Sequence, residues 1–128
     1  MAIVPSEQLV QLKAQLSDYA PALTALQEIE ACEGNLEDAA ISLAIQAGQL
    51  PQEGNADWLE DVAKRCRALL CSEIPRQNLQ TGAIEKVILT VANSDLVPAI
   101  LATPVVLFVL SQDLEAFCAP LDQAMGKP

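Results

Sequence analysis

Histidine is absent from this 128-residue sequence, and aromatic and basic residues are both scarce. Without histidine, the chain cannot form a Ser-His-Asp triad, use an imidazole for acid–base catalysis or hold zinc through histidine ligands. Only 7 lysine and arginine residues stand against 17 aspartate and glutamate residues, which gives a net charge of −10 at pH 7. A surface this acidic repels phosphate backbones and anionic lipids, so we expect neither a nucleic acid nor a membrane as partner.

A hydrophobic run long enough to cross a membrane is also missing from the sequence. The longest apolar segment, residues 96–110, has 15 residues and is interrupted by Pro98 and Pro104. A membrane-spanning helix needs about 20 apolar residues. The first residues lack the basic and apolar regions of a secretory signal. We therefore expect a cytoplasmic protein with residues 96–110 in its core.

The short motifs that support many enzymes and cofactor sites are missing as well. The glycines follow none of the phosphate-binding spacings, and no serine lies in a G-x-S-x-G turn. The acidic residues lack the spacing of a calcium-binding loop. We expect no catalytic residues, no cofactor and no metal ion, and hence no enzyme. Arg76, which follows Pro75 in a predicted loop, is an isolated cation that would suit an anion, but one arginine does not make a site.

The four cysteines form no C-x-x-C pair and have no histidine partner for a metal site. They are Cys32, Cys66, Cys71 and Cys118. In a reducing cytoplasm we expect four free thiols, buried or half-buried, with a disulfide or a redox role as the alternative. Cys66 has cationic neighbours within residues 64–67, and nearby positive charge lowers the pKa of a thiol. It is therefore the one candidate for a reactive thiol, although no base accompanies it.

Aliphatic side chains are what the sequence has in abundance. Hydrophobic residues make up 52% of the chain and aromatic residues only 3%, so leucine, isoleucine, valine and alanine must fill a packed core. A chain of this length is expected to form a single helical domain over residues 1–128. We predict an all-α, compact bundle of about six or seven short helices, with sub-structure at residues 6–48 and 55–128.

Apolar residues spaced three and four apart predict three helices in the first part of the chain. Their stripes lie within residues 9–19, 23–32 and 36–44. Gly34 suits the left-handed position that ends a helix, and Asn35 can cap the helix that follows. The first third of the chain therefore reads as three consecutive helices with short connections.

The rest of the sequence is less uniform. Residues 49–55 form the most linker-like stretch, and a helix is predicted after it that Pro75 ends. Residues 84–91 and 105–110 fit helices, but both are short, β-branched and continuous, as buried strands are. Two such strands would give an α+β alternative, with a small βαβ element at residues 83–110. We prefer the all-helical fold because a two-stranded sheet alone is weak.

The turn between the second and third predicted helices resembles that of a known family. Gly34-Asn35 is followed by an acidic residue, by Ala39 and by Leu43. This order is similar to that of ubiquitin-associated and CUE-type three-helix modules. Residues 6–47 therefore resemble such a UBA-like module, which implies that they form three packed helices.

Two departures concern the residues with which such modules grip ubiquitin. Tyr19-Ala20-Pro21 stands where CUE-type modules carry Met-Phe-Pro, and Leu43-Ala44 stands where the family ends its third helix in a leucine pair. The resemblance thus implies the fold more than it implies ubiquitin as the ligand. The same three-helix pattern occurs in bacterial translation factors, where it binds other partners.

Taken together, these patterns favour a non-catalytic cytoplasmic protein-interaction or regulatory module. The predicted contacts with a protein partner are Tyr19 and Pro21 in the first loop, Leu43 at the end of the third helix, and the aromatic anchor Trp58, for which core packing is the alternative. The acidic face within residues 28–38 is predicted to be solvated. As a partner surface it would prefer a basic ligand and would be sensitive to salt.

Two alternative functions use the apolar last third of the chain. Residues 81–121 would line a cavity for an apolar ligand, because this region is more apolar than a marginal core requires. The same region would instead form the seam of a homodimer, since contiguous apolar surface often marks an interface.

Overall fold

The computed structural model describes residues 3–49 and 58–124, and the regular secondary structure in these ranges is helical. The predicted all-α class is therefore confirmed. The elements are α1 (Ser6–Gln15), α2 (Ala20–Ala31), α3 (Leu36–Gln46), α4 (Trp58–Arg65), α5 (Arg67–Leu70), α6 (Glu73–Thr81), α7 (Ile84–Ala92), the 3₁₀ helix η1 (Ala99–Leu101), α8 (Ala102–Leu110) and α9 (Leu114–Ala124). Most are short, as expected for a small helical bundle.

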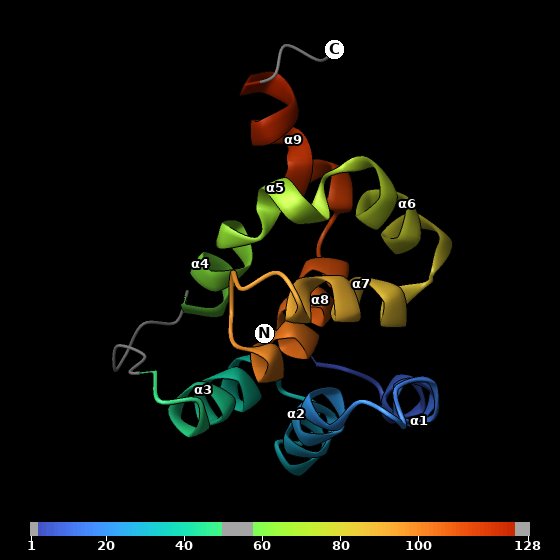
Figure 1. The fold of residues 1–128 in the computed structure, drawn as a ribbon, viewed down its shortest axis with the longest axis vertical. Helices are drawn as coiled ribbons and strands as arrows, with labels where there is room; N and C mark the ends of the chain where they lie inside the picture. Colours follow the sequence, from blue (N-terminus) through green and yellow to red (C-terminus); the bar gives the residue numbers. More distant parts are fainter. Residues whose placement is uncertain (1–2, 50–57, 125–128) are drawn as a thin grey trace.

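Helix α8 lies at the centre of the molecule (Figure 1). Helices α2, α3, α4 and α7 pack against it, and α9 adjoins it. Residues 101–109 are therefore buried without interruption. Because α8 is covered all round, its sequence is apolar at every position except Thr103 and loses the periodicity of a surface helix. Without that periodicity, the sequence of residues 105–110 fitted a strand as well as a helix. In the structure these residues lie in α8, and residues 84–91 lie in α7.

The first three helices share one hydrophobic core with the helices that follow. Both η1 and α8 contact α2 and α3, and both also contact α7. Buried residues from the two predicted sub-structures belong to one cluster, in which Leu26, Leu43 and Val106 are fully buried. The described residues of the two predicted sub-structures, 6–48 and 58–124, thus share one core and do not form a separate core each.

The turn between α2 and α3 is built as the sequence indicates. Gly34 has a φ of +86°, which favours glycine, and its N–H donates to the Ile29 carbonyl at 2.8 Å. The Asn35 side chain accepts a hydrogen bond from the Asp38 N–H at 3.0 Å and caps α3. An extended segment also crosses this turn, because the Val4 N–H donates to the Gly34 carbonyl at 2.9 Å. Sequence patterns gave no indication of that last contact.

The helix predicted to end at Pro75 is instead a series of three short helices. Helix α4 ends at Arg65, α5 spans Arg67–Leu70 and α6 begins at Glu73. Pro75 is the third residue of α6, where its missing N–H leaves no helical hydrogen bond unmade. Pro75 therefore belongs to the start of a helix. The predicted linker at residues 49–55 lies, apart from its first residue, outside the described residues.

The prediction of four free thiols is wrong for two of the four cysteines. Cys71, the residue after α5, is bonded to Cys118 of α9, 47 positions away in the sequence. Cys32 and Cys66 are free. The reactive-thiol interpretation of Cys66 is also corrected, because the residue is 0% exposed and burial raises the pKa of its thiol more than neighbouring Arg65 lowers it. The thiol therefore stays protonated inside the core at neutral pH.

Within the described ranges, no single helix is both long and apolar enough to cross a membrane. One pair of segments, Ala99–Leu110 and Leu114–Ala124, meets the requirements of length and composition together, but the two are bent by 97°.

Candidate functional site

The four residues predicted to contact a partner occupy different environments. Tyr19 immediately precedes α2, and Pro21 is the second residue of that helix; both are half-buried. Trp58 opens α4, is half-buried and packs against the core. Leu43 is 0% exposed. Its prediction as a contact residue is therefore corrected: the side chain belongs to the core beneath α3, where a partner cannot reach it.

The structure does not gather these residues into one site. Tyr19 lies in the connection between α1 and α2, whereas Trp58 starts α4, and α1 and α4 occupy opposite sides of the view in Figure 1. Helix α4 does pack on α3. The third helix thus packs on both α2 and α4, the two helices at whose starts these residues lie.

Two isoleucines on α3 are exposed instead of Leu43. Ile41 is 36% exposed and Ile45 is 61% exposed, and a spacing of four places them on one face of the helix. The first turn of α3 carries Glu37 and Asp38. We call these four residues the α3 ridge. The sequence contained a usable indication, because Ile41 and Ile45 fall outside the stripe that contains Leu43.

The N-terminal segment that carries the α3 ridge is strongly acidic. Residues 3–49 contain seven acidic residues and one lysine, which gives a net charge of −6. That lysine, Lys13, forms an ion pair with Glu30 at 2.8 Å. Cys32 donates a long hydrogen bond to Glu28 at 3.8 Å, and its thiol pKa is raised by burial and by the charges of Glu28 and Asp38. The thiol therefore stays neutral, and the region presents carboxylates and apolar groups.

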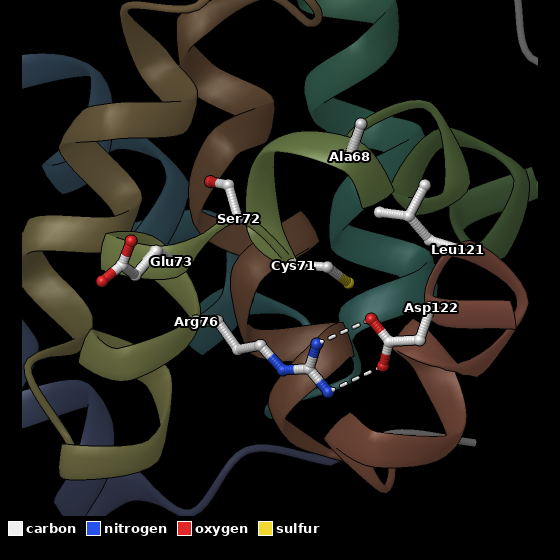
Figure 2. Close-up of a pocket in the computed structure, with 7 residues that line it drawn as sticks. All are labelled: Ala68, Cys71, Ser72, Glu73, Arg76, Leu121 and Asp122. Atoms are coloured by element: carbon white, nitrogen blue, oxygen red, sulfur yellow. Dashed lines mark hydrogen bonds and ion pairs between the residues drawn. The ribbon is translucent and has the colours of Figure 1, made fainter. Parts of the chain in front are cut away.

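A second candidate site is a pocket of about 390 Å³ where α5 and α6 meet α9. Figure 2 shows the residues that line it. They are Ala68, Cys71, Ser72, Glu73, Arg76, Leu121 and Asp122. The pocket thus combines one sulfur of the disulfide with a guanidinium group and carboxylates.

Arg76 does not serve as an open anion site. Its Nη1 and Nη2 atoms donate to the two carboxylate oxygens of Asp122 at 3.0 and 3.1 Å, and Nη2 also donates to Glu115 at 3.0 Å. The hydrogen bond to Asp122 is the main reason that the pKa of Arg76 is raised, which keeps the group charged. The residue lies on α6 and not in a loop, and it joins α6 to α9. The prediction that Arg76 lies in a loop is thereby corrected.

The described part of the chain therefore offers two places at which function can reside. One is the exposed α3 ridge, and the other is the disulfide-lined pocket beside α9. Among the described residues, no three cysteine, aspartate or glutamate side chains are grouped as metal ligands. Neither a protein-family model, nor a curated protein, nor a solved structure matches the chain.

Proposed function

We propose that the chain is a non-catalytic protein-interaction module that binds its partner through the α3 ridge. The observation that carries this proposal is the exposure of Ile41 and Ile45 one turn apart on a well-capped helix. Exposed apolar side chains in isolation are ordinary, but two on one helix face beside carboxylates form a surface with a defined complement. The expected location remains the cytoplasm.

The charge of this surface selects the partner. With a net charge of −6 on residues 3–49, the ridge attracts a segment that carries lysine or arginine beside its apolar anchors. An amphipathic helix with one apolar and one basic face has this chemistry. A second copy of the chain would bring another acidic ridge, and like charges would oppose the contact. We therefore favour a basic partner protein over a homodimer at this surface.

The resemblance to ubiquitin-associated and CUE-type modules agrees with this assignment. Such modules are three-helix units that present residues near the end of their third helix to a partner. Here Ile41 and Ile45 occupy that part of the surface, whereas Leu43 is turned into the core. The proposed contact surface therefore still lies on α3, as predicted, but it consists of Ile41 and Ile45 in place of Leu43.

The test compares capture of partners by the full chain and by two variants. Ile41→Asp with Ile45→Asp removes the apolar part of the ridge. Ile74→Asp is the matched control, because Ile74 is 69% exposed and lies on α6, away from α3. Helical content measured by circular dichroism should be the same for all three proteins.

We expect one partner to be captured equally by the wild type and by the Ile74 variant, and about tenfold less by the ridge variant. Binding of the purified partner, measured by calorimetry, should weaken as salt is raised, because screening reduces the attraction between opposite charges. Equal capture by the ridge variant would place the binding surface elsewhere. Equal loss in both variants, or binding that salt does not affect, would also contradict the proposal.

The alternative function, binding of an apolar ligand, was suggested by the apolar composition of the last third of the chain, and the structure explains that composition in another way. The apolar residues 101–109 are buried against the surrounding helices, so core packing accounts for their composition. The pocket found beside α9 is lined by charged as well as apolar side chains and is not part of that apolar segment. No specific observation favours this second function.

A further inference from the structure

The two sulfur atoms of the disulfide differ in their access to the pocket beside α9. Cys71 lines the pocket and is 8% exposed, whereas Cys118 is 0% exposed. Figure 2 shows the Cys71 side chain directed into the space between Ala68, Leu121 and the Arg76–Asp122 pair. We propose that this pocket is a thiol–disulfide exchange site, at which a dithiol reductant reduces the Cys71–Cys118 bond and thereby releases α9.

The chemistry requires only the disulfide and the incoming dithiol. One thiolate of the dithiol attacks Cys71 Sγ, which forms a mixed disulfide and expels Cys118 as a thiolate that takes up a proton. The second thiol of the reagent then displaces Cys71, which is released and protonated. The protein disulfide gains two electrons and two protons, and the dithiol is oxidised to its own disulfide. The pocket determines which sulfur is attacked first.

Helix α9 buries few of its side chains in the core. Of its eleven residues, only Phe117 and Cys118 are buried. Pro120 lies inside the helix and cannot donate a helical hydrogen bond, which weakens the helix by itself. The helix projects from one end of the molecule (Figure 1) and packs on α5 and α8. An element with so little buried surface has a low local stability once its covalent link is broken.

The remaining attachments of α9 are two partly buried leucines, Leu114 and Leu121, which pack against the core, and a set of electrostatic contacts. The guanidinium of Arg67 lies 4.9 Å from the centre of the Phe117 ring, a cation–π contact. Arg76 binds Asp122 and Glu115, both from α9. Glu115 is 68% exposed, so its ion pair is screened and contributes little. Reduction therefore leaves α9 held by the buried Phe117 ring, by two partly buried leucines and by the carboxylate of Asp122.

Release of α9 would change the character of this end of the protein. Phe117 would leave the core, and Arg67 and Arg76 would lose the ring and the carboxylates that cover them. Reduction would thus expose two arginines and an apolar surface on a protein that is otherwise acidic. The disulfide would set whether this surface is available.

Three measurements on the full chain test the proposal. First, titration of thiols in denaturant should find two free thiols in the air-oxidised protein, Cys32 and Cys66; finding four would overturn it. Second, brief exposure to glutathione followed by acid quenching should give a mixed disulfide at Cys71, mapped by mass spectrometry. An adduct at Cys118, or none at all while the protein stays oxidised, would overturn the assignment of the pocket.

Third, hydrogen exchange should show α9 amides exchanging at least about tenfold faster after reduction with dithiothreitol, while α1–α3 amides keep their rates. The double variant Cys71→Ser with Cys118→Ser should match the reduced protein without any reductant. The variant Cys32→Ser is the matched control and should match the oxidised wild type. Unchanged protection of α9, or equal acceleration in all helices, would show that the disulfide does not control α9 separately.

Discussion

Replacing Gly34 by alanine should destabilise the protein more than the same change at any other described glycine with positive φ. A Cβ atom at Gly34 would lie 2.6 Å from the Val4 carbonyl oxygen and 3.2 Å from the Val4 nitrogen. Both are backbone atoms, and the Val4 N–H is bonded to the Gly34 carbonyl at 2.9 Å. The extended segment at residues 3–4 must therefore move away, which breaks that hydrogen bond and exposes Val4, now 7% exposed.

The expected change in the free energy of unfolding is the sum of separate contributions. A left-handed conformation costs an alanine about 1–2 kcal/mol relative to glycine. Loss of a backbone hydrogen bond costs about 0.5–1.5 kcal/mol net, and uncovering part of Val4 adds up to about 1 kcal/mol. The lower entropy of the unfolded alanine variant offsets about 0.4–1 kcal/mol. We expect Gly34→Ala to lower the free energy of unfolding by about 2–3 kcal/mol.

Gly82→Ala is the matched control for this prediction. Gly82 has a φ of +87°, nearly the same as that of Gly34, but nothing lies within 4 Å of its added Cβ. It therefore isolates the conformational cost, about 1 kcal/mol. Urea denaturation followed by circular dichroism measures both variants under the same conditions. Equal destabilisation of the two variants would refute the reasoning, since the contact with Val4 would then carry no energy.

Three further predictions concern single residues. Asn35→Ala should lower the free energy of unfolding by about 1 kcal/mol in urea denaturation, whereas Asn35→Asp, which keeps an acceptor for the Asp38 N–H, should be nearly neutral; equal effects would argue against the cap. Leu43→Ala should cost about 2–5 kcal/mol because the side chain is 0% exposed, and the folded variant should still bind the partner of the α3 ridge. Cys66 should make stability fall above about pH 9, because the unfolded thiol ionises near its ordinary pKa of 9.0 while the buried thiol, whose pKa is raised, stays neutral. Below that pH the Cys66 thiol is protonated in both the folded and the unfolded state, so it makes no contribution to the pH dependence of stability. The Cys66→Ala variant should show a shallower decline in the free energy of unfolding at alkaline pH. An unchanged slope would contradict the conclusion that the buried Cys66 thiol stays neutral.

Local features of the fold were predictable from the sequence because their causes are local. The stripes of α1 to α3 and the turn at Gly34 and Asn35 depend on residues within a few positions of one another. The same holds for the all-α class, which the structure confirms. Helix α8 was harder, because complete burial removes the alternation of apolar and polar residues by which a helix is recognised.

Features that depend on distant parts of the chain were not predictable. The bond between Cys71 and Cys118 joins positions 47 apart, and the pair of Arg76 with Asp122 joins positions 46 apart. No spacing rule connects such residues until the path of the chain is known. The α3 ridge was missed for a different reason: the family resemblance pointed to Leu43, although Leu43 belongs to the apolar stripe of α3 and Ile41 and Ile45 lie outside it.

The central position of α8 has a consequence for the order in which the chain can fold. Helices α2 and α3 both pack on η1 and α8, which span residues 99–110. A ribosome that adds about 5–20 residues per second needs roughly 3–12 s to extend the chain from α3 to the end of α8. During that interval η1 and α8 are not yet present to pack on α2 and α3, the helices that carry Leu26 and Leu43, two side chains that are fully buried in the folded protein. The α1–α3 segment is therefore synthesised before the helices that complete its packing. A chaperone that binds apolar nascent segments would be able to bind it before η1 and α8 pack on it.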